Sequence, residues 1–193
     1  MKRLEWDFLI KCHGWDKQEY YVDRMTEALL EGEDTIMIPE EDYEEAFAVR
    51  EAVIREEQRL RRTAELNNKG IALEKEGRIE EAIKVYEQNI QIGYPATHSY
   101  ERLMILYRKR KDYGDEIRVA RLAIDVFSKC NEKKAERVIE RYPDREQEIR
   151  GCLLKNEELR DTLTGKIIFS PYEVGKYIRR LEKSKELLKK EEN

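Results

Sequence analysis

The segment between Pro39 and Gly70 contains no proline and no glycine, the two residues that most often interrupt a helix. Across this segment, apolar side chains recur at intervals near three and four residues: Tyr43, Ala46, Phe47, Val53, Ile54, Leu60 and Ala64. Such spacing places them on one side of an α-helix. The sequence therefore predicts one long helix from about residue 40 to about residue 76, with a break near residues 61–64 as the alternative.

The composition favours helices in the rest of the chain as well. Charged residues make up 41% of the 193 residues and hydrophobic residues 40%, whereas only 9 glycines and 4 prolines are present. This balance suits amphipathic helices with a solvated face better than it suits sheets. We therefore expect an all-α fold. One short extended stretch is expected at residues 36–38, because the residue before Pro39 is pushed out of the helical region.

The two ends of the chain also show helical patterns. Residues 5–30 predict one or two amphipathic helices with a break at Gly14, and residues 131–141 and 144–159 predict two more. Residues 161–169 read as a turn with a short β-prone run. The last helix has a predicted capping box, with Ser170 as N-cap and Glu173 three residues later; Phe169 and Val174 are spaced as a hydrophobic staple.

Gly70 stands inside a segment that otherwise reads as helix, although an interior glycine costs about 1 kcal/mol relative to alanine. Its presence indicates that the missing side chain is needed for packing at this point. A shift of 34 residues also places the polar turn and helix start at residues 77–83 onto residues 111–117, and it places Leu73 onto Tyr107. Helix pairs that repeat at this interval are typical of a helical solenoid.

Residues 63–96 and 97–130 resemble two degenerate copies of the tetratricopeptide repeat. The residues that carry the resemblance are small ones at close crossings and large ones between them: Gly70, Ala82, Ala123, Leu73, Tyr86, Leu103 and Tyr107. The second copy departs from the pattern, because Met104 and Glu116 stand where the first copy has Gly70 and Ala82. The resemblance implies a helical-hairpin solenoid with flanking N- and C-terminal helices.

This reading divides the chain into three parts. Residues 1–62 are expected to form an N-terminal helical segment that ends in the long helix, and residues 63–130 to form the two repeats. Residues 131–193 are expected to supply C-terminal helices, a short turn at residues 161–169 and a final helix that caps the stack with a solvated face.

The resemblance also implies a role in binding a protein or peptide on the concave helical face. The residues expected on that face are Asn67, Asn68, Ile71, Glu74 and Lys75 from the first copy and His98, Glu101, Arg102, Ile105, Arg108 and Lys109 from the second. Asn68 and Arg102 match two positions of the clamp with which some family members hold a terminal carboxylate, and His98 stands where a lysine would be. An acidic or C-terminal segment is the implied partner; the alternative is that these are solvated residues of a charged surface.

Other functional classes find little support in the sequence. The net charge of -4 gives no positive field for nucleic acid, and no long apolar run or signal-peptide pattern indicates a membrane or secretion, so we expect a cytoplasmic protein. Cys12, Cys130 and Cys152 are too few and too scattered for a disulfide framework. The histidines, His13 and His98, form no metal or catalytic pattern with them, so we expect no metal, no cofactor and no catalysis.

Two other functions stay open at this point. One is a structural or assembly subunit that forms a homo-oligomer through the aromatic N-terminus and the long helix. The other is an enzyme with an unfamiliar helical active site, which would require a pocket that gathers strongly perturbed titratable groups.

Overall fold

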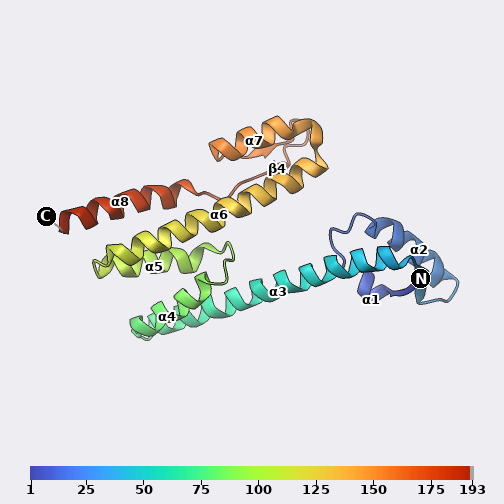
Figure 1. Cartoon of the computed structure of the whole chain (residues 1–193), viewed down its shortest axis with the longest axis horizontal. Coiled ribbons are helices and arrows are strands. Elements are labelled where there is room, and N and C mark those ends of the chain that lie inside the picture. Colours follow the sequence, from blue (N-terminus) through green and yellow to red (C-terminus); the bar gives the residue numbers. More distant parts are fainter. Residues whose placement is uncertain (192–193) are drawn as a thin grey trace. The chain divides into compact units, whose positions relative to one another are not determined.

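The computed structural model describes residues 1–191, and most of them are helical (Figure 1). The chain divides into two compact units, Met1–Arg62 and a second unit that begins at Thr63. A mostly helical fold is therefore confirmed, but two small antiparallel sheets are present as well. Within residues 1–191, each helix is either too short or too polar to cross a lipid bilayer.

The first unit is not purely helical. It contains β1 (Lys2–Glu5), α1 (Trp6–Leu9), α2 (Gln18–Leu30), β2 (Thr35–Ile38) and the start of α3 (Glu40–Lys75). The extended stretch predicted before Pro39 is confirmed as β2. Of the helices predicted over residues 5–30, α1 is only four residues long and α2 begins at Gln18. The break predicted at Gly14 is confirmed, because Gly14 turns the chain with a φ of 87°.

A hydrophobic core and a set of hydrogen bonds from Lys17 hold this unit together. Leu4 of β1, Met25 of α2 and Ile38 of β2 are fully buried in the same core. Above that core, the Lys17 ammonium donates to Asp42 at 2.6 Å and to Glu45 at 2.9 Å. The start of α3 is thereby fixed against α2, which accounts for the acidic residues gathered there.

The second unit begins with the last turns of α3. It continues through α4 (Ile79–Ile90), α5 (Thr97–Lys109), α6 (Tyr113–Arg141), the 3-10 turn η1 (Pro143–Arg145), α7 (Glu146–Lys155), β3 (Leu159–Arg160), β4 (Ile167–Phe169) and α8 (Gly175–Glu191). The long helix predicted over residues 40–76 is confirmed as α3, without the alternative break at residues 61–64. The helix expected to begin at Asn131 is instead the second half of α6.

Asn131, in the middle of α6, explains why α8 begins late. Its buried amide sits inside α6, donates to the Tyr172 carbonyl at 3.0 Å and accepts from the Tyr172 N–H at 2.7 Å. These two bonds hold the segment before α8 extended against α6. Helix α8 accordingly begins at Gly175, four residues later than predicted from an N-cap at Ser170.

The capping box and the hydrophobic staple predicted at this point do not form. The Ser170 hydroxyl lies 3.3 Å from Glu158, and Glu173 forms an ion pair with Arg179. Phe169 is fully buried in a small core with Ala135 and Ile149, whereas Val174 packs against the larger core of the unit. Tertiary packing has therefore overridden a local capping signal.

Helix α8 lies along α6 and also bonds to α5 (Figure 1). Lys176 near its start forms an ion pair with Glu101 at 2.6 Å, and Ser184 two turns later accepts from Arg108 at 3.0 Å. Since both pairs advance in the same order along the chain, α8 runs in the same direction as α5. It thus covers the end of the helical row, with Tyr177 buried in the core.

The close helix crossing predicted at Gly70 is confirmed. A Cβ atom built on Gly70 would lie 2.3 Å from a carbon of the Tyr86 ring, which no real packing allows. Tyr86 is itself fully buried. The ring of α4 therefore lies directly on the backbone of α3.

Substituting alanine for Gly70 tests this crossing. The overpacking costs about 1–3 kcal/mol and is offset by a gain of about 1 kcal/mol in helix propensity, so Gly70→Ala should lower the free energy of unfolding by up to about 2 kcal/mol. The matched control is Gly151→Ala in α7, where an added Cβ meets nothing within 4 Å. Urea denaturation followed by circular dichroism should show that variant unchanged or stabilised; equal effects at the two glycines would contradict the crossing.

Candidate binding surface

The last turns of α3 and helix α5 are joined by an ion pair with a tyrosine beside it. The Nε and Nη2 atoms of Arg102 each donate to one carboxylate oxygen of Glu74, and the Nε bond is 2.9 Å long. The Tyr86 hydroxyl donates to the same carboxylate at 2.8 Å. Because the Gly70 crossing brings Tyr86 onto α3, the missing side chain at residue 70 also positions this carboxylate for Arg102.

A neutral polar cluster joins α3 and α5 one to two helical turns before this ion pair. The Ser99 hydroxyl donates to the side-chain oxygen of Asn67 at 2.6 Å. The side-chain NH2 group of Asn89 donates to the same Asn67 oxygen and to the Ser99 hydroxyl, at 2.8 Å each. The Asn89 amide also reaches the Thr63 backbone carbonyl at 3.1 Å. These bonds satisfy the buried NH2 group of Asn89, whereas its side-chain oxygen is buried without a hydrogen-bond partner among residues 1–191.

A buried carboxylate joins α5, α6 and α8. Glu116 of α6 is 0% exposed and receives Arg108 of α5 at 2.9 Å and Arg180 of α8 at 2.6 Å. A buried charge is tolerated when it is paired and hydrogen-bonded, and here two guanidinium groups surround one acid. This accounts for the departure at Glu116 from the small residue expected in the second copy.

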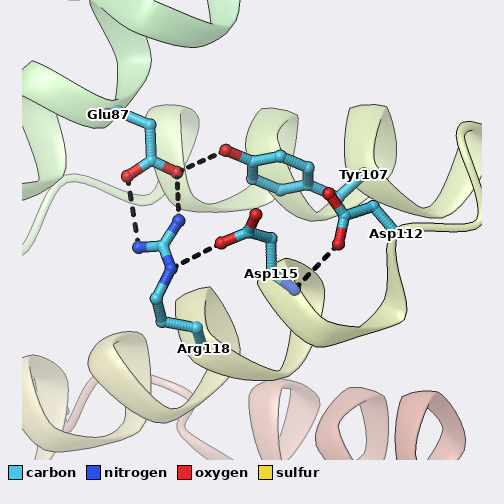
Figure 2. Close-up of polar contacts among 5 residues, drawn as sticks. All are labelled: Glu87, Tyr107, Asp112, Asp115 and Arg118. Atoms are coloured by element: carbon cyan, nitrogen blue, oxygen red, sulfur yellow. Dashed lines mark hydrogen bonds and ion pairs between the residues drawn. The ribbon is translucent and has the colours of Figure 1, made fainter. Parts of the chain in front are cut away.

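A further polar network ties α4 to the second helical hairpin (Figure 2). The Tyr107 hydroxyl donates to Glu87 at 2.8 Å, and Arg118 contacts the same carboxylate at 2.7 Å and 3.2 Å. The Arg118 Nε donates to the Asp115 carboxylate at 2.7 Å. The backbone N–H of Asp115 donates to the carboxylate of Asp112, the N-cap residue of α6, at 3.1 Å. The network links three helices, α4, α5 and α6.

The titration behaviour of the Glu74 cluster does not suit proton transfer. The Arg102 hydrogen bonds, with a smaller contribution from Tyr86, hold the pKa of Glu74 below its usual value. Burial, and then the Glu74 carboxylate, raise the pKa of Tyr86 above its usual value. Both shifts keep each group in its ordinary charge state near pH 7, whereas a general acid or base needs a pKa near the working pH.

The residues predicted for binding gather on adjacent helices. We call them together the α3–α5 face: Asn67, Asn68, Ile71, Glu74 and Lys75 of α3, with His98, Glu101, Arg102, Ile105, Arg108 and Lys109 of α5. Arg102 and Arg108 were expected to be available to a ligand. The structure differs from this expectation, because Arg102 already forms an ion pair with Glu74 and Arg108 with Glu116. His98 lies with its Nε2 3.5 Å from the Tyr86 hydroxyl. Asn68, Lys75 and Lys109 are exposed.

Sequence reasoning missed the contribution of α8. Lys176 and Arg180 join this face through Glu101 and Glu116, yet α8 lies outside the 34-residue spacing and carries no signal of its place beside α5. It also missed Tyr86 and Asn89 as the groups beneath the face. Asn89 stands where the repeat pattern expects a small residue, and this was the available signal for a buried polar cluster.

Comparisons with known proteins identify no relative of this chain. No protein-family model matches the chain, and neither a curated protein nor a solved structure matches it. Among residues 1–191, no group of three or more His, Cys, Asp and Glu side chains is arranged to hold a metal ion.

The Glu74–Arg102 pair predicts a pH-dependent stability. Glu74→Gln should lower the free energy of unfolding by about 1–3 kcal/mol at pH 7, because it leaves the partly buried Arg102 poorly paired. Since the folded-state pKa of Glu74 is lowered, its contribution is present above the unfolded pKa of about 4.3 and is lost as the pH falls through the folded value. The difference between variant and wild type should therefore shrink below about pH 4.

Glu80→Gln is the matched control for this titration. Glu80 also pairs with an arginine, Arg110, but its side chain is 74% exposed, so the change should cost about 0.5 kcal/mol or less. Denaturation curves measured at several pH values give the comparison. A gap between Glu74→Gln and wild type that stays constant down to pH 3 would show that the pair does not stabilise the fold through its charge.

Proposed function

We propose that this protein is a non-catalytic interaction module that binds a protein or peptide segment on the α3–α5 face. The observation that carries the proposal is that two adjacent helices are held in register by Glu74–Arg102 and Asn67–Ser99, beneath a row of exposed or half-exposed side chains. A rigid scaffold with its internal charges already paired gives a ligand a surface that does not need to reorganise.

The tetratricopeptide-like arrangement is part of the same proposal. The close crossing at Gly70 and the parallel directions of α5 and α8 support it. A cytoplasmic location belongs to the proposal as well, and it is supported by Cys12, Cys130 and Cys152, none of which forms a disulfide.

Self-association is a second candidate function, and apolar side chains exposed along α3 in the first unit favour it. Phe47 is 47% exposed and Leu60 is 50% exposed on this helix, while Val53 and Ile54 between them are half-buried. A mass measured by light scattering distinguishes the candidates. A concentration-independent dimer that Leu60→Glu converts to monomer would favour the assembly subunit.

Selection from a display library of random peptides tests the interaction module. We expect wild-type protein to enrich peptides that fail to bind the variant Ile71→Asp with Ile105→Asp, because both side chains lie on the α3–α5 face and are half-buried. The control pair is Ile178→Asp with Leu154→Asp, which changes exposed apolar side chains of α8 and α7. Peptides retained equally by all three proteins, or no enrichment, would contradict the proposed face.

A further inference from the structure

We infer that β1 is a pairing edge, through which two copies of this chain join antiparallel into one sheet, with two strands from each copy. The pairing is separate from the proposed function, because it uses neither the α3–α5 face nor the apolar side chains along α3. Three features carry it: the open edge of the sheet, two exposed charges on β1 and the register that those charges select.

The sheet of the first unit has an open edge along β1. Among residues 1–191, this sheet consists of β1 and β2 alone, with Leu4 opposite Ile36, so one side of β1 has no strand beside it. Apart from the bonds to β2, the backbone groups of residues 2–4 form no hydrogen bond with another part of the described chain. Such an edge is a template for a further strand.

The other edge of this sheet, along β2, has less to select a partner. The four residues of β2 include no charged side chain, and β2 also contacts α2. Strand β1 instead carries charges of both signs. Charge complementarity can therefore choose a partner at β1 and has nothing to act on at β2.

Arg3 and Glu5 place opposite charges on the outer face of β1. Alternate residues of a strand share a face, so both side chains lie on the face opposite Leu4, which is fully buried in the core. Both are exposed, and neither has an ion-pair partner in the part of the chain that the structure describes. Lys2 differs, because it pairs with Glu40 at 2.9 Å. Arg3 and Glu5 are therefore available to a second molecule.

Symmetry and charge together identify that molecule as a second copy of the chain. When a strand pairs antiparallel with its own copy across a two-fold axis, one residue lies opposite itself and its neighbours exchange partners. An axis at Lys2, Arg3 or Glu5 puts like charges opposite each other, which is unfavourable. An axis at Leu4 instead puts Arg3 opposite Glu5 of the second copy, and it does so twice. The chain thus carries the complement of its own edge.

This pairing extends the sheet and leaves each core as it is. A two-fold axis perpendicular to the sheet keeps both cores on one face, so Leu4 stays packed in its own core while the backbone of β1 bonds across the edge. A strand of four residues from each copy makes a small interface. Small interfaces are weak, so we expect a dimer that forms at micromolar or higher concentrations of protein.

The charges of β1 have a competing role to exclude. Charged side chains on a short edge strand also serve to block pairing in monomeric proteins. A blocking edge predicts a monomer at every concentration and no benefit from exchanging the two charges between copies. The experiment therefore exchanges them.

Sedimentation equilibrium over about 5 to about 500 µM protein, at about 50 mM salt, measures the dimer. Arg3→Glu and Glu5→Arg each place like charges across the axis, so each variant alone should raise the dissociation constant at least about tenfold. An equimolar mixture of the two variants should restore dimers of wild-type affinity, because the acids of one copy then face the arginines of the other. Recovery in the mixture also shows that both variants are folded.

Lys11→Glu and Glu31→Arg are the control variants, exposed elsewhere in the first unit, and should dimerise like the wild type. Wild-type protein that stays monomeric up to about 500 µM, or a mixture that dimerises no better than its separate variants, would overturn the inference. A dimer that Arg3→Glu keeps and Leu60→Glu dissociates would also overturn it, and would favour self-association along α3. None of these outcomes bears on the peptide selection that tests the α3–α5 face.

Discussion

The contact between the Gly70 backbone and the Tyr86 ring sets the geometry of the second unit. Because residue 70 has no side chain, α4 can place a tyrosine ring directly on α3. The hydroxyl of that ring then reaches Glu74, and Glu74 in turn holds Arg102 of α5. One missing methyl group thus determines where the next helix lies and which side chains the two helices present together.

The buried charges of this unit are paired with one another. Glu116 is fully buried between Arg108 and Arg180, and Glu87 is shared by Tyr107 and Arg118 (Figure 2). Removing one member of a buried pair leaves an uncompensated charge, so such pairs fix a single arrangement of helices. What is left for a partner is the smaller set of side chains that these pairs do not use.

The sequence predicted well what depends on local periodicity and on one backbone feature. The long α3, the extended stretch before Pro39 and the close crossing at Gly70 each have a local signal. It failed where a distant partner decides the conformation. Strand β1 forms because β2 lies beside it, and the start of α8 is delayed because Asn131 binds the Tyr172 backbone.

The candidate site was predictable to a similar extent. A spacing of 34 residues was enough to put Ile71, Lys75, Ile105 and Lys109 on adjacent helices, since helical spacing alone decides which side chains share a face. The spacing could not indicate that Arg102 and Arg108 are already held by acids. Those pairings require knowing which helices touch, and α8, which completes the pairing at Glu116, follows no repeat.

The central claim is that a ligand is bound by the side chains of α3 and α5 left unpaired by the internal ion pairs. Backbone amide chemical shifts, measured by NMR during titration with a peptide that display selection enriched on the wild-type protein, test it most directly. The account predicts that shifts concentrate in residues 67–75 and 98–109. Shifts confined to the outer side of α4, to α7 or to residues 1–62 would contradict it.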